Sequence, residues 1–216
     1  EGDCRLLREH ATDLVFAPSV DEIYPDGPAL RTRVEVPALN EILCGASRPG
    51  HFTGVATVVA KLLNIVQPDL AVFGLKDYQQ LMVIRHTVRD LSLPVEIFGG
   101  AVAREPSGLA MSSRNVYLTD AERKIAPSLY ATLCVIAEQL KSGEHNLERL
   151  TAAGMKAISQ AGMKPDYLEI RRAQDLALAA PGDTELVIPV AAYLGRARLI
   201  DNIRVTLPAP GLQASS

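Results

Sequence analysis

A lysine shortly after an apolar run is the first residue whose surroundings suggest chemistry. Lys76 comes after the run Leu70–Phe73 and the residues Gly74 and Leu75, and a helical pattern begins at Tyr78. Ligands bind at the carboxyl ends of parallel strands, and the free N–H groups of a helix N-terminus attract phosphate. Lys76 adds a positive charge, and Gly74 lets a ligand approach the backbone. The pattern predicts a phosphate site here, with an ordinary turn and a surface lysine as the equally weighted alternative.

A second segment, Gly108–Asn115, places two hydroxyl groups next to a guanidinium group. Ser112, Ser113 and Arg114 are suited to wrap a polyphosphate, because arginine binds phosphate oxygens in a bidentate manner. The alternative is a solvated linker in which serine and asparagine only form turns. The apolar Leu109–Met111 is unusual in a linker and predicts burial or a ligand.

Two further pairs of polar residues lie near the starts of the predicted helices. Arg48 and His51 precede a helical pattern, where they could face an anion at the helix N-terminus. A capping or packing role is the alternative, and it is the preferred interpretation for His51. Gln79 and Gln80 lie one turn into the next helix, and adjacent helical residues do not share a face. We therefore expect one glutamine to point toward the site and the other away.

The elements around these residues alternate between helix and strand. We expect helices over 52–66 and 78–88 and strands over 70–73 and 95–98, following the apolar spacing and the prolines at 68 and 94. The unbroken apolar run 70–73 predicts a strand covered on both faces. This order indicates an α/β unit with a parallel sheet. Upstream, we expect a helix over 3–10, a short buried strand over 14–17 and a strand over 32–36.

The pattern changes after Gly99–Gly100. Thr119 and Glu122 form a capping-box sequence before a long helix that Pro127 kinks or divides, and Asn146 starts another helix. Strands are expected over 167–171, 186–192 and 198–205, the last two joined by a hairpin and therefore antiparallel. Helices followed by strands predict a small α+β domain. We expect domains over 1–103 and 104–216.

Composition and spacing exclude several classes of protein. The 216 residues are 48% hydrophobic, which excludes a disordered chain, and 22 basic against 25 acidic residues argue against a nucleic-acid or membrane-surface binder. Three scattered cysteines predict no disulfide framework, and no apolar run is long enough for a membrane span. A soluble, cytoplasmic protein is expected. The sequence has no P-loop and no Ser-His-Asp order, which argues against a Walker-type ATPase or a hydrolase.

Taken together, these segments resemble the pantoate–β-alanine ligase (pantothenate synthetase) family in order and spacing over nearly the whole chain. The resemblance is carried by the segments 44–59, 73–81, 108–115 and 197–202. It implies an α/β fold: a Rossmann-like nucleotidyltransferase domain with a parallel sheet, followed by a small α+β lid domain with an antiparallel sheet. It also implies a homodimer that uses MgATP to join pantoate and β-alanine through pantoyl adenylate, releasing AMP and pyrophosphate.

The resemblance also implies roles for individual residues. The expected ATP-binding residues are Gly74, Leu75, Lys76, Asp77, Ala103, Met111, Ser112, Ser113 and Arg114. Of these, Lys76, Ser112, Ser113 and Arg114 are the expected catalytic residues, in a loop analogous to the KMSKS loop of class I aminoacyl-tRNA synthetases. Gln80 is expected to bind pantoate, with Val55, Val58 and Val59 as a wall for its methyl groups. Arg48 and His51 are expected near the reacting centre, and the metal ligands are not assigned.

The sequence departs from the family pattern at two places. Leu75 stands where glutamate is frequent, and the opening segment with its H-x-G-H-type histidine pair is missing from the sequence. We therefore expect a larger enzyme that lacks its first catalytic motif. Two alternatives stay open: a non-catalytic fragment that binds nucleotide weakly or acts as a scaffold, and a related nucleotidyltransferase with another acid substrate.

Overall fold

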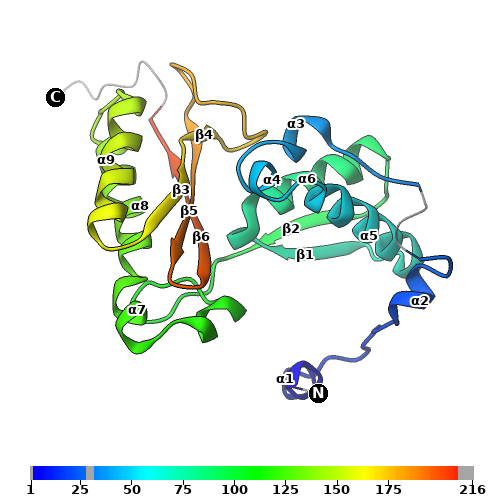
Figure 1. The fold of residues 1–216 in the computed structure, drawn as a ribbon. Coiled ribbons are helices and arrows are strands. Elements are labelled where there is room, and N and C mark those ends of the chain that lie inside the picture. Colours follow the sequence, from blue (N-terminus) through cyan, green and yellow to red (C-terminus); the bar gives the residue numbers. More distant parts are fainter. Residues whose placement is uncertain (1, 28–31, 209–216) are drawn as a thin grey trace. The chain divides into compact units, whose positions relative to one another are not determined.

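The chain forms two compact units, Glu1–Arg33 and Val34–Ser216, in a computed structural model that describes residues 2–27 and 32–208 (Figure 1). The described parts of both expected domains from Val34 onward belong to the second unit. The division between 103 and 104 stays a prediction.

The first unit contains two short helices. The helix α1 (Gly2–Glu9) confirms the expected helix over 3–10, and Ser19 caps α2 (Val20–Ile23) through a capping box with Glu22. The expected buried strand over 14–17 is wrong, because these residues form no strand and Leu14 is 83% exposed. A strand needs a partner for its backbone groups, and no described residue pairs with this segment.

The expected strand over 32–36 is also wrong. Its residues form no strand, and the Val34 amide donates to the Thr57 hydroxyl at 3.0 Å instead of to a neighbouring strand. Val36 is buried and precedes α3 (Pro37–Asn40), after which comes α4 (Cys44–Ser47). The alternating pattern therefore reflects packing on a helix.

A parallel two-stranded sheet forms the centre of the next region, as expected. Strands β1 (Leu70–Gly74) and β2 (Glu96–Gly100) pair in parallel, and α6 (Tyr78–Asp90) connects them after the short helix η2 (Leu75–Asp77). The helix α5 (His51–Val66) precedes β1 and packs against α6 (Figure 1). Gly50 begins α5 in the left-handed region at φ 77°, a conformation that glycine adopts without strain.

The expectation that both faces of 70–73 are covered is wrong. Ala71 and Phe73 pack against the cluster of Leu63, Ile84 and Val88 on one face of the sheet. On the other face Val72 is 64% exposed. An unbroken apolar run thus occurs here in a strand with one covered face.

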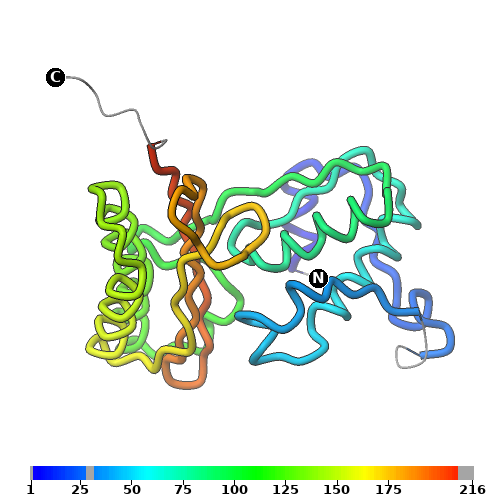
Figure 2. The backbone as a smooth tube through the Cα atoms, turned by 90° about the horizontal axis from the view of Figure 1, so that it is seen from above, coloured from blue at the N-terminus to red at the C-terminus, as the bar shows by residue number. Residues whose placement is uncertain are grey.

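The second half of the unit is a layer of helices on an antiparallel sheet. The helices are η3 (Ser113–Tyr117), α7 (Asp120–Ile125), α8 (Ser128–Lys141) and α9 (Leu147–Gln160). The strands are β3 (Lys164–Leu168), β4 (Arg171–Arg172), β5 (Glu185–Leu194) and β6 (Ala197–Thr206). Strand β5 pairs with β3 and β4 on one edge and with β6 on the other, and α8 and α9 cover the sheet (Figure 2).

Local signals in this half act as the sequence predicted. Thr119 and Glu122 form the capping box of α7, Pro127 separates α7 from α8, and the Asn146 side chain caps α9. The hairpin of β5 and β6 is antiparallel, as expected. The fold class is confirmed: a parallel α/β part is followed by an α+β part with an antiparallel sheet.

The parallel and antiparallel parts share a buried core. Phe52, Tyr78 and Val83 from the first part belong to the same apolar cluster as Leu176 and Val187 from the second. The Tyr78 hydroxyl also donates to the Ala173 carbonyl oxygen at 2.6 Å. These contacts place the start of α6 directly beside the antiparallel sheet.

Candidate active site

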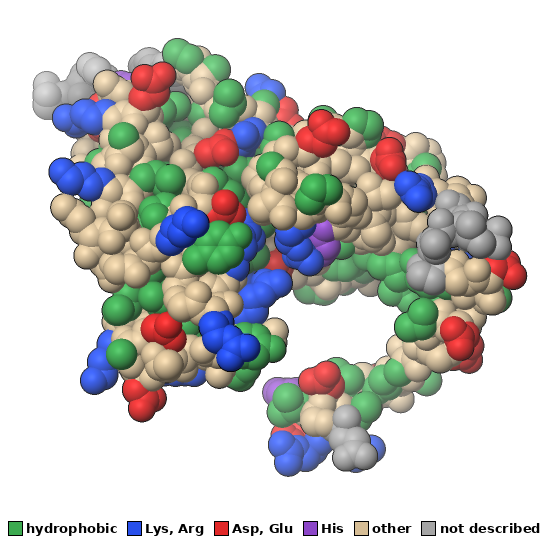
Figure 3. Space-filling model, viewed as in Figure 1, with side chains coloured by type: hydrophobic (Ala, Val, Ile, Leu, Met, Phe, Trp, Pro, Cys, Tyr) green, Lys and Arg blue, Asp and Glu red, His purple; other side chains and the backbone are tan. Residues whose placement is uncertain are grey.

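A cavity of about 270 Å³ lies where η2 and α6 meet the strands β5 and β6. Its basic lining residues are Arg48, Lys76, Arg114 and Arg198, its acidic ones are Asp77 and Asp201, and His51 also lines it. Lys and Arg side chains lie beside a histidine on the face shown in Figure 3. The excess of positive charge in a concave site favours an anionic ligand.

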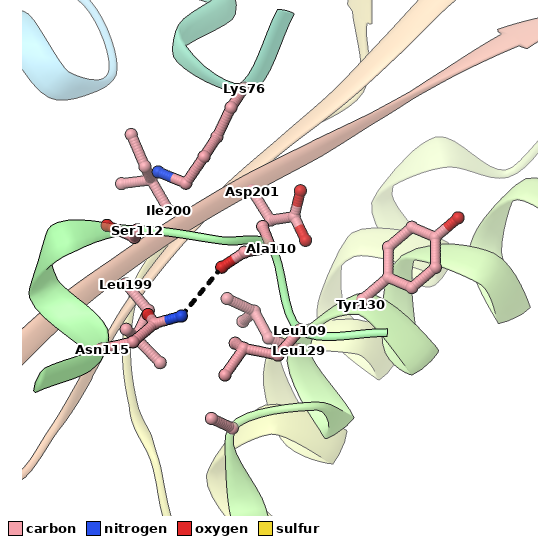
Figure 4. A pocket seen from close by; sticks show the side chains of 11 residues that line it. Lys76, Leu109, Ala110, Ser112, Asn115, Leu129, Tyr130, Leu199, Ile200 and Asp201 are labelled. Carbon is pink, nitrogen blue, oxygen red and sulfur yellow. Dashed lines mark hydrogen bonds between the residues drawn. The ribbon is translucent and has the colours of Figure 1, made fainter. Parts of the chain in front are cut away.

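Lys76 lies at the boundary between this cavity and a second, smaller one. The smaller cavity has room for about one water molecule, at about 10 Å³, and Lys76, Ser112 and Asp201 are among its lining residues (Figure 4). Lys76 belongs to η2, directly after β1, where the backbone turns into α6. The structure therefore brings the two expected phosphate-binding segments together at Lys76.

The segment that carries Ser112 and Arg114 is held by its own hydrogen bonds. The Ser112 hydroxyl accepts from the Arg114 amide at 3.2 Å, and the Met111 amide donates to the Ala103 carbonyl oxygen at 2.9 Å. The buried Asn115 donates to the Ala110 carbonyl oxygen at 3.1 Å, as drawn in Figure 4. A solvated linker would not have this ordered base.

The burial expected for the apolar residues 109–111 is confirmed in two of three cases. Leu109 and Ala110 are buried, whereas Met111 is 59% exposed. Burial of the first two anchors the segment on the antiparallel part and leaves Met111 accessible to a ligand.

Arg48 and His51 lie together at the wall of the larger cavity. Arg48 Nη1 is 3.1 Å from His51 Nε2, and because a guanidinium group only donates, Nε2 accepts. Burial lowers the pKa of His51, and the charges of Arg48 and Arg114 lower it further, while Asp77 acts in the opposite direction. His51 is therefore a neutral acceptor beside a fixed positive charge.

The two neighbouring glutamines have different surroundings, although both line the cavity. Gln79 is buried and hydrogen-bonds backbone groups only: its Nε2 donates to the carbonyls of Leu39 and Ile42, and its Oε1 accepts from the Cys44 amide. Gln80 is half-buried and has no side-chain hydrogen bond to any described residue. Gln80 is thus the glutamine available to a ligand.

Several expected site residues do not line either cavity. Val55 and Val59 pack against the apolar cluster that α5 and α6 form beside the parallel sheet, and the Leu75 side chain packs against the shared core. The other residues outside both cavities are Val58, Gly74, Ala103, Met111 and Ser113. Their expected contacts with ligand stay predictions.

Sequence reasoning missed the residues that the antiparallel sheet contributes. Arg198 reaches the cavity from β6, where Asp166 binds it at 2.7 Å and Cys44 Sγ lies 3.4 Å from its Nη1. Cys44 Sγ is also 3.1 Å from the hydroxyl of Tyr167, whose pKa is raised, mainly by burial. The segment 197–202 contributed to the resemblance, but nothing in its sequence indicated which side chains face the cavity.

Among the described residues, no group of three His, Cys, Asp or Glu side chains could hold a metal ion. Asp77 follows Lys76 directly in sequence, is exposed and lines the larger cavity. Mg²⁺ is usually held through one or two carboxylates plus substrate phosphates, so this lining fits an ion that arrives with a nucleotide. No helix in the described part of the chain is long and apolar enough to span a membrane.

Comparisons with known proteins agree with this arrangement. Residues 1–204 match the family model described as pantoate-beta-alanine ligase. Pantothenate synthetase from Alkalilimnicola ehrlichii is 59% identical over 205 residues, which are 95% of this chain and 72% of that protein. Pantothenate synthetase from Pseudomonas fluorescens is 56% identical over 209 residues, which are 97% of this chain and 73% of that protein.

Solved structures show the same relationship. The crystal structure of pantothenate synthetase from Thermus thermophilus is 45% identical, with a TM-score of 0.87 over 94% of this chain and 73% of that one. Pantoate-beta-alanine ligase from Francisella tularensis, complexed with beta-gamma ATP and beta-alanine, is 38% identical, with a TM-score of 0.72 over 94% of this chain and 68% of that one. On the evidence of its sequence and its fold, the chain belongs to the pantoate-β-alanine ligase family.

Proposed function

We propose that this protein condenses pantoate with β-alanine in an ATP-dependent reaction that passes through pantoyl adenylate. The observation that carries the proposal is the cavity in which Lys76, Gln80 and Arg114 meet, in a chain of this family. A cationic wall and a neutral amide suit a nucleotide and a hydroxy acid, respectively.

In the first half-reaction, a carboxylate oxygen of pantoate attacks the α-phosphorus of ATP. The bond between the α-phosphorus and the bridging oxygen breaks, and pyrophosphate leaves with that electron pair. Lys76 and Arg114 both line the cavity and are the proposed groups that stabilise the charge developing on the leaving group. Charge stabilisation of this kind is a large contribution to catalysis. Ser112 and Ser113 supply hydroxyl donors from the same loop.

Contacts from the backbone of the same segments complete the proposed nucleotide site. Gly74, Leu75 and Asp77 flank Lys76 at the end of β1. The Ala103 carbonyl is hydrogen-bonded to Met111 at the base of the segment Gly108–Asn115, which we call the serine loop. We assign all of these residues to the proposed ATP-binding site.

Gln80 is the proposed partner of the pantoate hydroxyl group. Its amide has no hydrogen bond to another described side chain or backbone group, so binding would not disrupt an existing contact. Val55, Val58 and Val59 remain the proposed wall for the two methyl groups of pantoate, on the helix α5 that begins at His51.

In the second half-reaction, the amine of β-alanine attacks the acyl carbon of pantoyl adenylate. The bond from that carbon to the phosphate oxygen breaks, AMP leaves, and the nitrogen loses a proton as the amide forms. The neutral His51 beside Arg48 is the proposed group near this centre. Mg²⁺ bound with ATP would neutralise phosphate charge. A cytoplasmic homodimer is part of the same proposal.

Product analysis tests the proposal on the purified protein. Pantothenate and AMP should form only when ATP, pantoate and β-alanine are all present. If AMP release required another carboxylic acid in place of pantoate, the protein would be a nucleotidyltransferase with a different substrate. If neither ATP binding nor AMP release occurred, the proposed function would be wrong.

A further inference from the structure

One asparagine side chain from the antiparallel sheet reaches across to the loop that carries Lys76. Asn202 Nδ2 lies 2.9 Å from the Leu75 carbonyl oxygen and 2.9 Å from the Lys76 carbonyl oxygen. Each N–H of the amide therefore has its own acceptor. Asn202 is 127 residues from Leu75 in sequence and is buried, with 6% of its surface exposed.

The preceding residue makes a corresponding contact with the second loop. Asp201 receives two hydrogen bonds from Arg104, at 2.6 and 2.9 Å, and is 5% exposed. Arg104 Nη1 also donates to the Gly108 carbonyl oxygen at 3.1 Å, and its guanidinium lies 3.4 Å above the Tyr130 ring. Arg104 thereby ties Asp201 to the base of the segment that carries Ser112 and Arg114.

Two consecutive residues of β6 thus hold the two loops of the cavity. Neighbouring residues of a strand point to opposite sides, so one strand can contact the Lys76 loop through Asn202 and the serine loop through Asp201. Lys76, Ser112 and Asp201 surround the same small cavity in Figure 4. Asp201 and Asn202 contribute no positive charge and need not touch the nucleotide.

We propose that Asn202 is a positioning residue that holds the Lys76 loop in its nucleotide-binding conformation. Asp201 holds the serine loop in the matching position beside the Lys76 loop. This inference rests on the proposed function insofar as the two loops are taken to bind ATP. A cationic side chain stabilises the charge on the departing pyrophosphate only when its backbone is held in place, because small displacements strongly reduce the effect. The pairing of β1 with β2 holds the chain up to Gly74, and Asn202 binds the next two carbonyl groups, those of Leu75 and Lys76.

A graded series of substitutions tests the role of Asn202. Asn202→Asp keeps the size but removes both N–H donors, Asn202→Ser keeps one donor, and Asn202→Ala keeps none. Arg204→Ala is the control, because Arg204 lies on the same strand and is exposed, and its ion pair within the described part of the chain is with Glu185. Hydrogen–deuterium exchange of residues 74–80 and calorimetric titration with ATP are the two measurements.

The expected result is local and graded. Exchange should rise in peptides covering 74–80 for the alanine and aspartate variants, with a smaller rise for serine, while peptides of α8 and α9 stay unchanged. ATP affinity should fall roughly tenfold or more for the alanine variant, the effect expected for one to two lost hydrogen bonds. Arg204→Ala should match the wild type in both measurements.

Two outcomes would overturn the inference. One is wild-type exchange in 74–80 for all three variants. The other is increased exchange throughout the protein with loss of the circular dichroism spectrum in all three, because Asn202 would then serve the fold and not the loop. Failure of the wild type to bind ATP would refute the proposed function instead, and the exchange data would still decide whether Asn202 positions the loop.

Discussion

Arg48 and His51 form a hydrogen-bonded pair across one turn of chain, with Arg48 Nη1 3.1 Å from His51 Nε2. The guanidinium can donate only while the imidazole is neutral. Burial and the charges of Arg48 and Arg114 lower the pKa of His51, so the folded protein favours this neutral form. The pair places an uncharged nitrogen and a permanent cation side by side at the cavity wall.

We predict that His51 makes the folded protein less stable at acidic pH. Between the usual histidine pKa of 6.5 and the lower folded value, the unfolded chain binds a proton that the folded chain does not. The free energy of unfolding should therefore decrease as the pH falls through this window. His51→Gln should remove that part of the pH dependence, whereas substituting the exposed His145 with glutamine should not. An NMR titration of His51 gives the folded pKa directly, and a value at or above 6.5 would contradict the prediction.

Lys76→Ala should lower the rate of adenylate formation more than it weakens pantoate binding. Removing one group that stabilises transition-state charge typically costs about 100-fold or more in rate. Single-turnover formation of pantoyl adenylate measures the first effect, and titration with pantoate measures the second. Lys156→Ala is the control, because Lys156 is exposed on α9, outside both cavities. An unchanged single-turnover rate would remove Lys76 from the proposed mechanism.

Gln79 and Gln80 should respond to alanine in different ways. Gln80→Ala should weaken pantoate binding roughly tenfold without a comparable change in ATP affinity or thermal stability. Gln79→Ala removes the partner of three backbone groups at Leu39, Ile42 and Cys44, and should lower the free energy of unfolding by about 2–4 kcal/mol. Calorimetric titration and chemical denaturation separate the two effects, and equal behaviour of both variants would refute this assignment.

Two glycines provide a matched test of backbone packing between α3, α4 and α5. A Cβ atom on Gly45 would lie 2.7 Å from the backbone carbonyl carbon of Asn40 and even closer to its oxygen, so Gly45→Ala should destabilise the protein by about 1–3 kcal/mol. Gly54 lies inside α5 with no other atom near such a Cβ, so Gly54→Ala should stabilise it by up to about 1 kcal/mol. Denaturant unfolding of both variants is the measurement. A Gly45→Ala variant as stable as the wild type would show that α3 and α4 can move apart.

Local signals were sufficient to predict most elements and part of the site. The capping box of Thr119 and Glu122, the break at Pro127 and the cap at Asn146 act within one helical turn, so the neighbouring residues determine them. Lys76 was predictable for a similar reason, because its position follows from the end of one strand and the start of the next helix.

Strand formation and side-chain direction depended on the distant parts of the chain. The segments 14–17 and 32–36 have strand-like patterns, yet neither pairs with another described strand. Val72 is exposed, although the apolar run 70–73 that contains it is typical of a strand covered on both faces. Helical spacing did not distinguish Gln79 from Gln80, and only the family resemblance assigned Gln80 to pantoate. The structure supplies the physical reason, because α3 and α4 provide backbone partners for Gln79.

By itself, the sequence determined which residue types are present, the positions of the longer helices such as α5 and α6, and the family resemblance, because these depend on local order along the chain. Only the tertiary structure decided that Arg198 lines the larger cavity and that Asn202 contacts the Lys76 loop. The physical reason is that a strand such as β6 presents its side chains according to its pairing register, and that register is set by contacts with β5 and with the parallel part of the unit.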